Sequence, residues 1–412
     1  MDNLRILMMA LFSGLTCTKA GRFDPSKVGP LPRPPPNFMN ASQLITYHGY
    51  EAETYNVHTE DGYILPLYRI ANKPGPPVLL MMGLGLGPEL WVLRGSGHDL
   101  GFILSDLGYD VWLGSMRGNH KTSNIRYNTS QPEFWDFSHD EIGYYDLPAM
   151  IDQILKKSTY SKLYYAGASL GSTIYMVLCS ERPEYQAMFS GSVHFGPAMW
   201  IPQWDMFTLG TKIYLSFLEF ALGILKVFGV LTVSNGSPSF DAWLKDFCNS
   251  PISGIFCYWG LDMIAGFNRN NMEPNWGGYT LGETASGSSI RSVQHLIQLT
   301  RKGGTQKYNW GPNVNFEKYG SYEPPSYSLS KIMSPTAIYY SKIDKLIPYE
   351  ATKITLSNIG NIRHAMAVPD PTYGHVEFIY GKNLYKLLFS NVVDFLDSLS
   401  GVDSSPSMHG SK

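Results

Sequence analysis

One short stretch constrains the fold more than any other: an apolar run that ends in a serine with a glycine two residues to either side. Residues 163–166 have the composition of a buried strand, Ser169 stands within Gly-Ala-Ser-Leu-Gly, and residues 172–180 favour a helix. This order is typical of a nucleophile elbow, in which the glycines let the helix pack close to a strained serine. The alternative is an ordinary strand-to-helix turn with a capping serine.

Strands and helices alternate around this stretch. Two runs joined by Glu60-Asp61-Gly62 predict a hairpin at one edge of a sheet. Continuous apolar runs predict buried strands, and amphipathic runs predict the helices between them. The expected strands are 50–57, 63–70, 78–82, 110–113, 163–166, 192–195, 336–340 and 362–368, and the expected helices are 100–107, 141–157, 172–180 and 384–399. The alternation predicts an α/β fold with a mainly parallel central sheet and helices on both faces.

The alternation fails between residues 199 and 330, where the chain is aromatic and rich in Asn and Gly. We expect an inserted cap there. The resulting division is a first core part at 21–198, the cap at 199–330, a second core part at 331–399 and a mobile tail at 400–412.

A long apolar stretch at 206–233 lies within the expected cap. By itself it could be a membrane span. However, Lys212, Glu219 and Lys226 interrupt it at seven-residue steps, which places charges along one side of a helix. We therefore expect a pair of cap helices and no transmembrane anchor.

The N-terminus predicts export. Residues 1–20 are typical of a secretory signal peptide. They contain Arg5, an apolar run at 6–15, and small residues at the positions that signal peptidase reads. The alternative is a buried N-terminal helix. Acceptor sequons for glycosylation, which agree with a secretory route, stand at Asn40, Asn128 and Asn235. We expect an extracellular or lysosomal destination.

Composition limits the partners and cofactors. The formal net charge is -2, so no global field favours nucleic acid, and we expect no nucleic-acid partner. Cys248 and Cys257 flank a Pro- and Gly-containing turn, and an oxidising compartment would allow a local disulfide between them. Cys179 is interpreted as a small buried hydrophobe. The cysteines show no metal-binding spacing, and we expect no metal and no cofactor.

A serine nucleophile needs a base, and the base needs an acid that fixes its tautomer. With a nucleophile elbow the chain order is serine, acid, histidine. Among the late histidines, His364 falls within a predicted strand and His409 in the tail, whereas His375 lies in a loop after the last strand. Asp344 follows a strand end and is the preferred acid, with Asp370 as its rival.

The glycine-rich loop at 83–87 follows a predicted buried strand. As a dinucleotide fingerprint it lacks a third glycine at the required spacing. We expect it instead to offer a backbone N–H group to an oxyanion. The two donors would be Leu84 in this loop and Leu170, the residue after the nucleophile.

Longer motifs resemble the acid lipase family of animals, the gastric and lysosomal type, and extend over about 39–398. The matching stretches are Gly-Leu at 83–84, Gly-Tyr-Asp-Val-Trp-Leu-Gly at 108–114, Arg-Gly-Asn at 117–119, Phe-Trp-Asp-Phe-Ser at 134–138, Tyr-Asp-Leu-Pro-Ala at 145–149 and Gly-His-Val-Glu-Phe-Ile-Tyr-Gly at 374–381. The resemblance implies an α/β-hydrolase fold with a cap over an acyl pocket. It also implies a catalytic triad of Ser169, Asp344 and His375. The oxyanion hole would be formed by Leu84 and Leu170, and a cap disulfide would join Cys248 to Cys257.

The chain departs from that family at three positions beside the site. The family usually has His at Met82, His at Ala168 and Gln at Leu170. Because a main-chain donor survives a side-chain change, we still expect an active serine lipase or esterase. Its substrates would be carboxylic esters of long-chain acyl groups, triacylglycerol or sterol ester, met at a lipid–water interface. The alternative is a lipid-binding or weakly active protein that keeps the cap and pocket.

Overall fold

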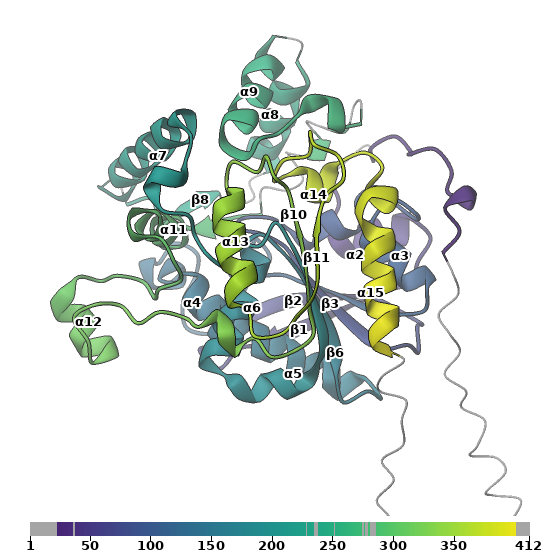
Figure 1. Cartoon of the computed structure of the whole chain (residues 1–412), viewed down its shortest axis with the longest axis horizontal. Coiled ribbons are helices and arrows are strands. Elements are labelled where there is room, and N and C mark those ends of the chain that lie inside the picture. The colour runs from purple at the N-terminus through teal and green to yellow at the C-terminus, as the bar shows by residue number, and fades with distance from the viewer. Residues whose placement is uncertain are drawn as a thin grey trace, which may run out of the picture.

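The computed structural model describes residues 23–35, 38–227, 229–234, 238–250, 252–273, 276, 279–280 and 286–400. A nine-stranded sheet forms the centre, in the order β1-β2-β4-β3-β6-β7-β10-β11 with β5 paired to β2 (Figure 1). Neighbours from β4 to β11 are parallel, whereas β1, β2 and β5 pair antiparallel at one edge. The predicted α/β fold with a mainly parallel sheet is confirmed.

The elements have the following bounds. The strands are β1 (Ala52–His58), β2 (Tyr63–Ile70), β3 (Pro77–Met81), β4 (Asp110–Gly114), β5 (Ser123–Asn124), β6 (Leu163–Ala168), β7 (Phe189–Phe195), β8 (Thr232–Ser234), β9 (Ser288–Ser289), β10 (Thr336–Tyr340) and β11 (Ile362–Ala367). The α-helices are α2 (Ala41–Tyr47), α3 (Leu100–Asp106), α4 (His139–Glu141), α5 (Leu147–Lys157), α6 (Leu170–Glu181), α7 (Leu209–Val227), α8 (Pro238–Asn249), α9 (Ser253–Ala265), α11 (Ile290–Lys302), α12 (Pro312–Tyr319), α13 (Tyr349–Asn358), α14 (Glu377–Tyr380) and α15 (Ser390–Ser400).

Each face of the sheet has its own apolar core. Helices α2, α3 and α15 cover one face, and α5 and α6 cover the other (Figure 1). The central strands β3, β4 and β6 are buried along their whole length. This explains their continuous apolar sequences, because a parallel strand is covered on both sides.

The helix expected at 141–157 is wrong in one respect, since it is not a regular α-helix. It begins at His139, after the N-cap Ser138, and passes through a π turn at Ile142–Asp146 before α5. Pro148 lacks the N–H that a regular helix would use at this point, and its ring would crowd the preceding turn. The wider turn places Asp146 inside, where its Oδ1 accepts from Arg117 Nε at 2.7 Å.

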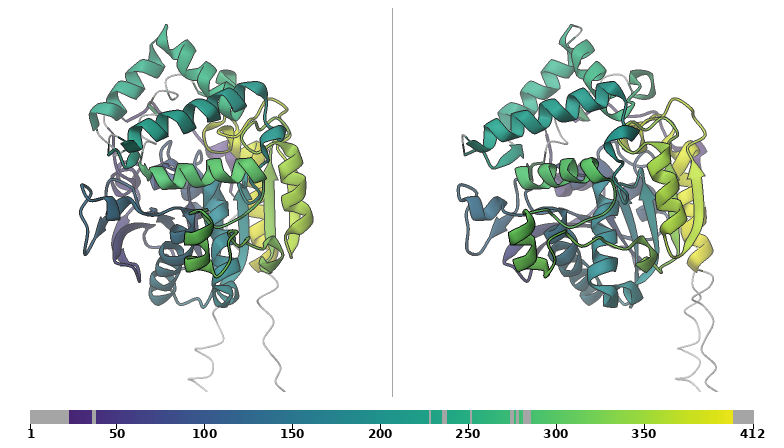
Figure 2. Two further views of the ribbon diagram at one scale, coloured as in Figure 1. Left: turned by 90° about the vertical axis from the view of Figure 1, so that its left-hand side faces the viewer. Right: turned by 60° about the vertical axis from the view of Figure 1, so that its left-hand side comes forward.

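The segment between β7 and β10 adds no strand to the large sheet within the described residues. Its helices α7, α8, α9 and α11 lie over one end of the sheet (Figures 1 and 2). The helix pair expected at 206–233 is wrong: a single helix, α7, is followed by β8, which pairs with β9. Gly229, at φ 74°, and the bond from Val230 N–H to Leu225 O close the helix as a left-handed cap does. In the described part of the chain, every helix is too short or too polar to cross a bilayer.

The expected disulfide is present. Cys248 of α8 and Cys257 of α9 are joined, with an S–S distance of 2.04 Å, and Cys179 is buried as expected. Asn128 is exposed, and Asn40 caps α2 by accepting from Gln43 N–H at 2.9 Å. Glycosylation at both sites stays a prediction. The signal peptide at 1–20, Asn235 and the tail beyond residue 400 lie outside the described residues.

His194 of β7 should make the fold less stable in acid. Its ring is fully buried beside Tyr165 and Tyr175, with neither nitrogen hydrogen-bonded in the described part of the chain. Burial lowers the pKa of His194 from 6.5 to about 3. Between these values only the unfolded chain takes up the proton, so the free energy of unfolding falls as pH drops, by about 1.4 kcal/mol per pH unit.

We therefore predict that His194→Leu loses less thermal stability than the parent protein between about pH 6.5 and pH 4. The measurement is the melting temperature followed across this range by circular dichroism. Replacing the exposed His58 with leucine is the matched control. It should leave the slope of melting temperature against pH unchanged. Equal slopes for His194→Leu and the parent protein would contradict the assignment.

Candidate active site

The elbow after β6 holds its serine in a strained backbone conformation. Ser169 has φ 52° and ψ -116°, a region that residues with a Cβ rarely adopt. Its N–H donates to Phe195 O of β7 at 2.9 Å. Glycines permit the close packing, because a Cβ on Gly171 would lie 2.6 Å from Met81 O and one on Gly83 would lie 3.2 Å from the Ser169 Cβ. Strand, loop and helix thus meet around the serine.

Two loops bring a histidine and an aspartate to this serine. His375 Nε2 lies 3.0 Å from Ser169 Oγ, and His375 Nδ1 lies 2.6 Å from Asp344 Oδ2. Asp344 Oδ1 accepts the N–H groups of Leu346 and Ile347 at 2.9 and 2.8 Å. Because an ionised carboxylate only accepts, Nδ1 carries the ring proton and Nε2 faces the hydroxyl with its lone pair. The arrangement suits transfer of the serine proton to Nε2.

Burial and charge act on His375 in opposite directions. Burial by itself lowers the pKa of the ring, whereas the hydrogen-bonded carboxylate of Asp344 and the charge of Glu377 raise it. The net pKa of His375 lies above its ordinary value of 6.5. A base with a raised pKa takes a proton more readily but is neutral only at higher pH.

The rival residues lie elsewhere. Asp370 Oδ1 accepts the N–H and the hydroxyl of Thr372 at 2.9 and 2.7 Å. The ring of His364, in β11, lies near the rings of Tyr339 and Phe395. His409 falls outside the described residues. Of the late histidines and acids that the sequence offered, the structure brings His375 and Asp344 to the serine.

Two backbone N–H groups are free beside the serine. Leu170 is the first residue of α6, so its N–H has no acceptor within the helix. Leu84 follows Gly83 in the loop that packs against Ser169. In the described part of the chain neither N–H donates to a protein acceptor. Free N–H groups at a helix N-terminus suit an oxygen that carries negative charge.

A cavity of about 390 Å³ opens over Ser169 and His375 and is lined by both core and insertion. Its lining is mostly apolar and includes Leu86, Phe195, Leu215, Leu218, Val293, Leu296, Ile297 and Phe378. Ala168 and Leu170 also line it, and Met82 is buried in the adjacent core. The three departures from the family pattern therefore make this surrounding more apolar than histidine or glutamine would.

The C-terminal end of α9 holds the loop of His375. His375 N–H donates to Ala265 O at 2.9 Å. A Cβ on Gly374 would lie 2.3 Å from Gly266 O, so only glycine allows the two segments to approach this closely. The Asp344 loop is tied to the same helix, since Lys345 Nζ lies 2.8 Å from Asp262 Oδ1. Cap and site are thus in direct contact.

Glu377 adds a buried carboxylate beside the candidate site, and sequence patterns alone assigned it no separate role. Its carboxylate is fully buried and accepts Asn268 N–H at 2.7 Å and Gly374 N–H at 3.0 Å. It therefore connects the chain after α9 with the His375 loop. Burial raises the pKa of Glu377 to about 7. The available signal was an acidic side chain inside the apolar run 376–380, where an unpaired charge is costly.

Comparisons with known proteins agree with this geometry. A family model described as a partial alpha/beta-hydrolase lipase region matches residues 41–95, and one described as the alpha/beta hydrolase fold matches residues 76–209. Among solved structures, a bacterial membrane phospholipase A is similar at 14% identity, with a TM-score of 0.51 over 87% of this chain and 89% of that one. At this identity the likeness shows the fold alone.

The similar curated proteins are lipases. Lipase 1 of Drosophila melanogaster is 32% identical over 87% of this chain and 80% of its own length. Lipase member N of Mus musculus is 33% identical over 88% of this chain and 91% of its own length. Gastric triacylglycerol lipase of Mus musculus is 32% identical over 89% of this chain and 93% of its own length. The chain is a carboxylic ester hydrolase of the α/β-hydrolase class. Within that class it belongs to the acid lipase family of animals.

Glu377→Gln should change the pH profile of the enzyme. The variant removes a charge that raises the pKa of His375, so the acid limb of kcat/KM should move to lower pH. Because an amide offers one acceptor oxygen, one of the two buried N–H partners is also left unpaired, which costs about 1–3 kcal/mol and should lower kcat.

The measurement is the pH profile of hydrolysis of a soluble ester. Glu377→Asp keeps the charge and should keep the midpoint, and Glu350→Gln, at an exposed position on α13, should match the parent protein. An acid limb that stays in place in folded Glu377→Gln would contradict the role of this carboxylate.

Proposed function

We propose that the protein is a lipase or esterase that hydrolyses long-chain acyl esters, triacylglycerol or sterol ester, through an acyl-enzyme at Ser169. The observation that carries this proposal is the hydrogen-bonded series Ser169–His375–Asp344 at the wall of a mostly apolar cavity. A nucleophile with its base, beside a space for an acyl chain, is what ester hydrolysis of lipids requires.

In the first half of the reaction, Ser169 Oγ attacks the ester carbonyl carbon while its proton passes to His375 Nε2. The carbonyl oxygen becomes negative and is bound by the N–H groups of Leu84 and Leu170. Collapse breaks the bond to the alcohol, which takes the proton from Nε2, and leaves the acyl group on Oγ. Water then repeats the steps and releases the fatty acid. Asp344 holds the ring orientation and stabilises the imidazolium throughout.

The oxyanion donors belong to the backbone, so Leu84 and Leu170 can serve with apolar side chains. One such donor is typically worth about 3 kcal/mol of transition-state stabilisation. The apolar cavity also strengthens this interaction, because little water competes inside it.

The cap at 199–330 presents an apolar outer surface, which supports docking at a lipid–water interface. Large side chains are exposed along one side of α7 and on α9, namely Leu209, Ile213, Phe217 and Phe220, then Ile255, Phe256 and Trp259. Exposed apolar groups on this scale mark an interaction surface. The disulfide between α8 and α9 fits an extracellular or lysosomal site of action.

A lipid-binding protein with little turnover is the second candidate. The observation in its favour is that Ala168 and Leu170 offer no polar side chain to support the reacting groups. Turnover that depends on Ser169 separates the two functions.

A fluorophosphonate should label Ser169, as shown by mass spectrometry of the digested protein, and Ser169→Ala should abolish both label and ester hydrolysis. Asp344→Asn should lower kcat by a factor on the order of 10⁴, because the ring loses its tautomer. Asp370→Asn, the rival acid, is the matched control and should remain active. A folded protein without label on Ser169 would rule out the acyl-enzyme. If the parent protein hydrolysed ester no faster than Ser169→Ala does, the hydrolysis would not come from this site, and binding would be left as its function.

The cap surface predicts a separate effect on emulsions. Phe217 and Trp259 are 67% and 61% exposed; replacing both with serine removes two apolar anchors of roughly 1.5–3 kcal/mol each. Activity on emulsified lipid should fall at least tenfold, while activity on a soluble short-chain ester stays unchanged. Phe316→Ser on α12 is the control, since this ring is 51% exposed but its helix lies apart from α7 and α9 (Figure 1). Equal losses on both substrates would argue against interfacial docking.

A further inference from the structure

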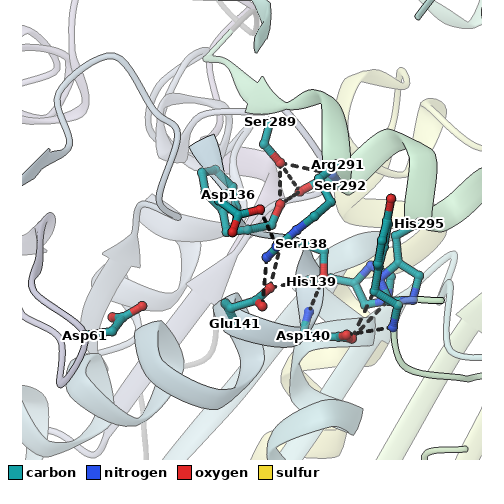
Figure 3. A network of polar contacts seen from close by, with 12 residues as sticks. Asp61, Asp136, Ser138, His139, Asp140, Glu141, Ser289, Arg291, Ser292 and His295 are labelled. Carbon is teal, nitrogen blue, oxygen red and sulfur yellow. Dashed lines mark hydrogen bonds and ion pairs between the residues drawn. The ribbon is translucent and has the colours of Figure 1, made fainter. Parts of the chain in front are cut away.

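A second group of reactive side chains lies outside the catalytic cavity. His139 and Asp140 belong to α4 of the core, and His295 belongs to α11 of the insertion; Figure 3 shows how they converge. One ligand atom from each of the three lies within 4.8 Å of the others. We propose that His139, Asp140 and His295 bind a divalent transition-metal ion, with Zn²⁺ the best match to two imidazoles and one carboxylate.

The ring of His295 has the protonation pattern of a metal ligand. Its Nε2 lies 2.9 Å from Gln306 O. Since a carbonyl oxygen only accepts, Nε2 carries the proton and Nδ1 has a free lone pair. Nδ1 lies 3.7 Å from Asp140 Oδ1 and has no hydrogen-bond partner in the described part of the chain. A ligating histidine commonly donates its other ring N–H to a backbone carbonyl in this way.

His139 faces the same carboxylate oxygen. Its Nε2 lies 3.8 Å from Asp140 Oδ1, nearly the same distance as that from His295. The ring is buried, and its Nδ1 has no partner among the described residues. Both imidazoles thus face one carboxylate oxygen.

The carboxylate is held in place by other groups. Asp140 Oδ1 accepts from the Tyr327 hydroxyl at 2.6 Å, and Oδ2 accepts from Tyr308 N–H at 2.9 Å. Such supporting hydrogen bonds orient metal ligands in known sites. Asp140 also borders a hollow of about 420 Å³ lined by Glu141, Lys307 and Trp310. Of the three proposed ligands, Asp140 is the one that reaches this hollow.

Binding would require a small movement. The rings of His139 and His295 lie face to face, with centroids 3.8 Å apart and 13° between their planes. Ligands bonded at about 2.0–2.2 Å around a tetrahedral ion lie roughly 3.4 Å apart, so the donors must draw together and the rings must turn apart. The torsion that turns a histidine ring is soft. Without an ion, the same residues form a neutral stacked pair, and the experiment below distinguishes the two.

The ion would join the core to the insertion. Val293, Leu296 and Ile297 of α11 line the catalytic cavity, so a metal on His295 would brace one of its walls. The helix has an independent attachment, because Arg291 binds Asp136 and Glu141 at 2.6 and 2.8 Å (Figure 3). Removing the metal should therefore leave the protein folded.

The test uses the full chain, treated with EDTA and dialysed, and titrated with Zn²⁺ by calorimetry and with Co²⁺ by absorption spectroscopy. We expect one ion per chain, the visible bands of tetrahedral Co²⁺ and a rise in melting temperature with Zn²⁺. Protein already labelled at Ser169 should bind equally, which separates this site from His375 and from the proposed function.

His139→Phe keeps a flat ring and Asp140→Asn keeps the size of the side chain, so each removes one ligand with little change in volume. Both should weaken Zn²⁺ binding at least tenfold, whereas exposed His58→Ala should not. Circular dichroism checks that each variant is folded, and either variant suffices for the test. Absence of stoichiometric binding in the parent protein, or equal affinity in a folded variant, would overturn the proposal and leave the stacked pair.

Discussion

The strained turn at Ser169 is the constraint on which the rest of the structure depends. A positive φ at a serine persists only where surrounding contacts over-determine it, and here they come from two strands and a loop. β7 accepts the serine N–H, β3 passes within contact distance of Gly171, and the loop after β3 presses Gly83 against the serine itself. The fully buried parallel strands supply this rigidity. The sheet order that brings β3 and β7 to either side of β6 is therefore also the order that positions the serine.

The insertion acts on this turn through the two loops that carry the other site residues. The end of α9 accepts the N–H of His375, pairs with the loop of Asp344 through Lys345, and reaches Glu377 through Asn268. The same helix bears exposed apolar side chains and is linked to α8 by the disulfide. The loops of His375 and Asp344 therefore both contact the C-terminal end of the helix that bears this exposed apolar surface.

The core could be predicted well because its strands and its elbow depend on short stretches of neighbouring residues. A buried parallel strand needs a continuous apolar run, and the elbow needs its glycines, so the β6 turn and the strand at 336–340 were readable from sequence. Features that depend on distant partners were not. The π turn before α5 depends on Asp146 reaching Arg117, and Glu377 has meaning only beside Asn268. His139 and His295 carry no spacing signal because they meet across the junction of core and insertion. The single helix α7 was missed because charge spacing shows which side of a helix is polar but not where it ends.

Side chains around Ser169 can be apolar because backbone groups make the polar contacts of the site. The proposed oxyanion donors, the partners of Asp344 Oδ1 and the acceptor for His375 N–H are all backbone groups. Backbone groups persist when side chains change, so Met82, Ala168 and Leu170 need not weaken the charges that matter. Their apolar character excludes water, and in a medium of low effective dielectric the interaction of His375 with Asp344 becomes stronger. The same exclusion disfavours a polar substrate. The apolar side chains of Ala168 and Leu170 are therefore consistent with the acyl-ester substrate proposed above.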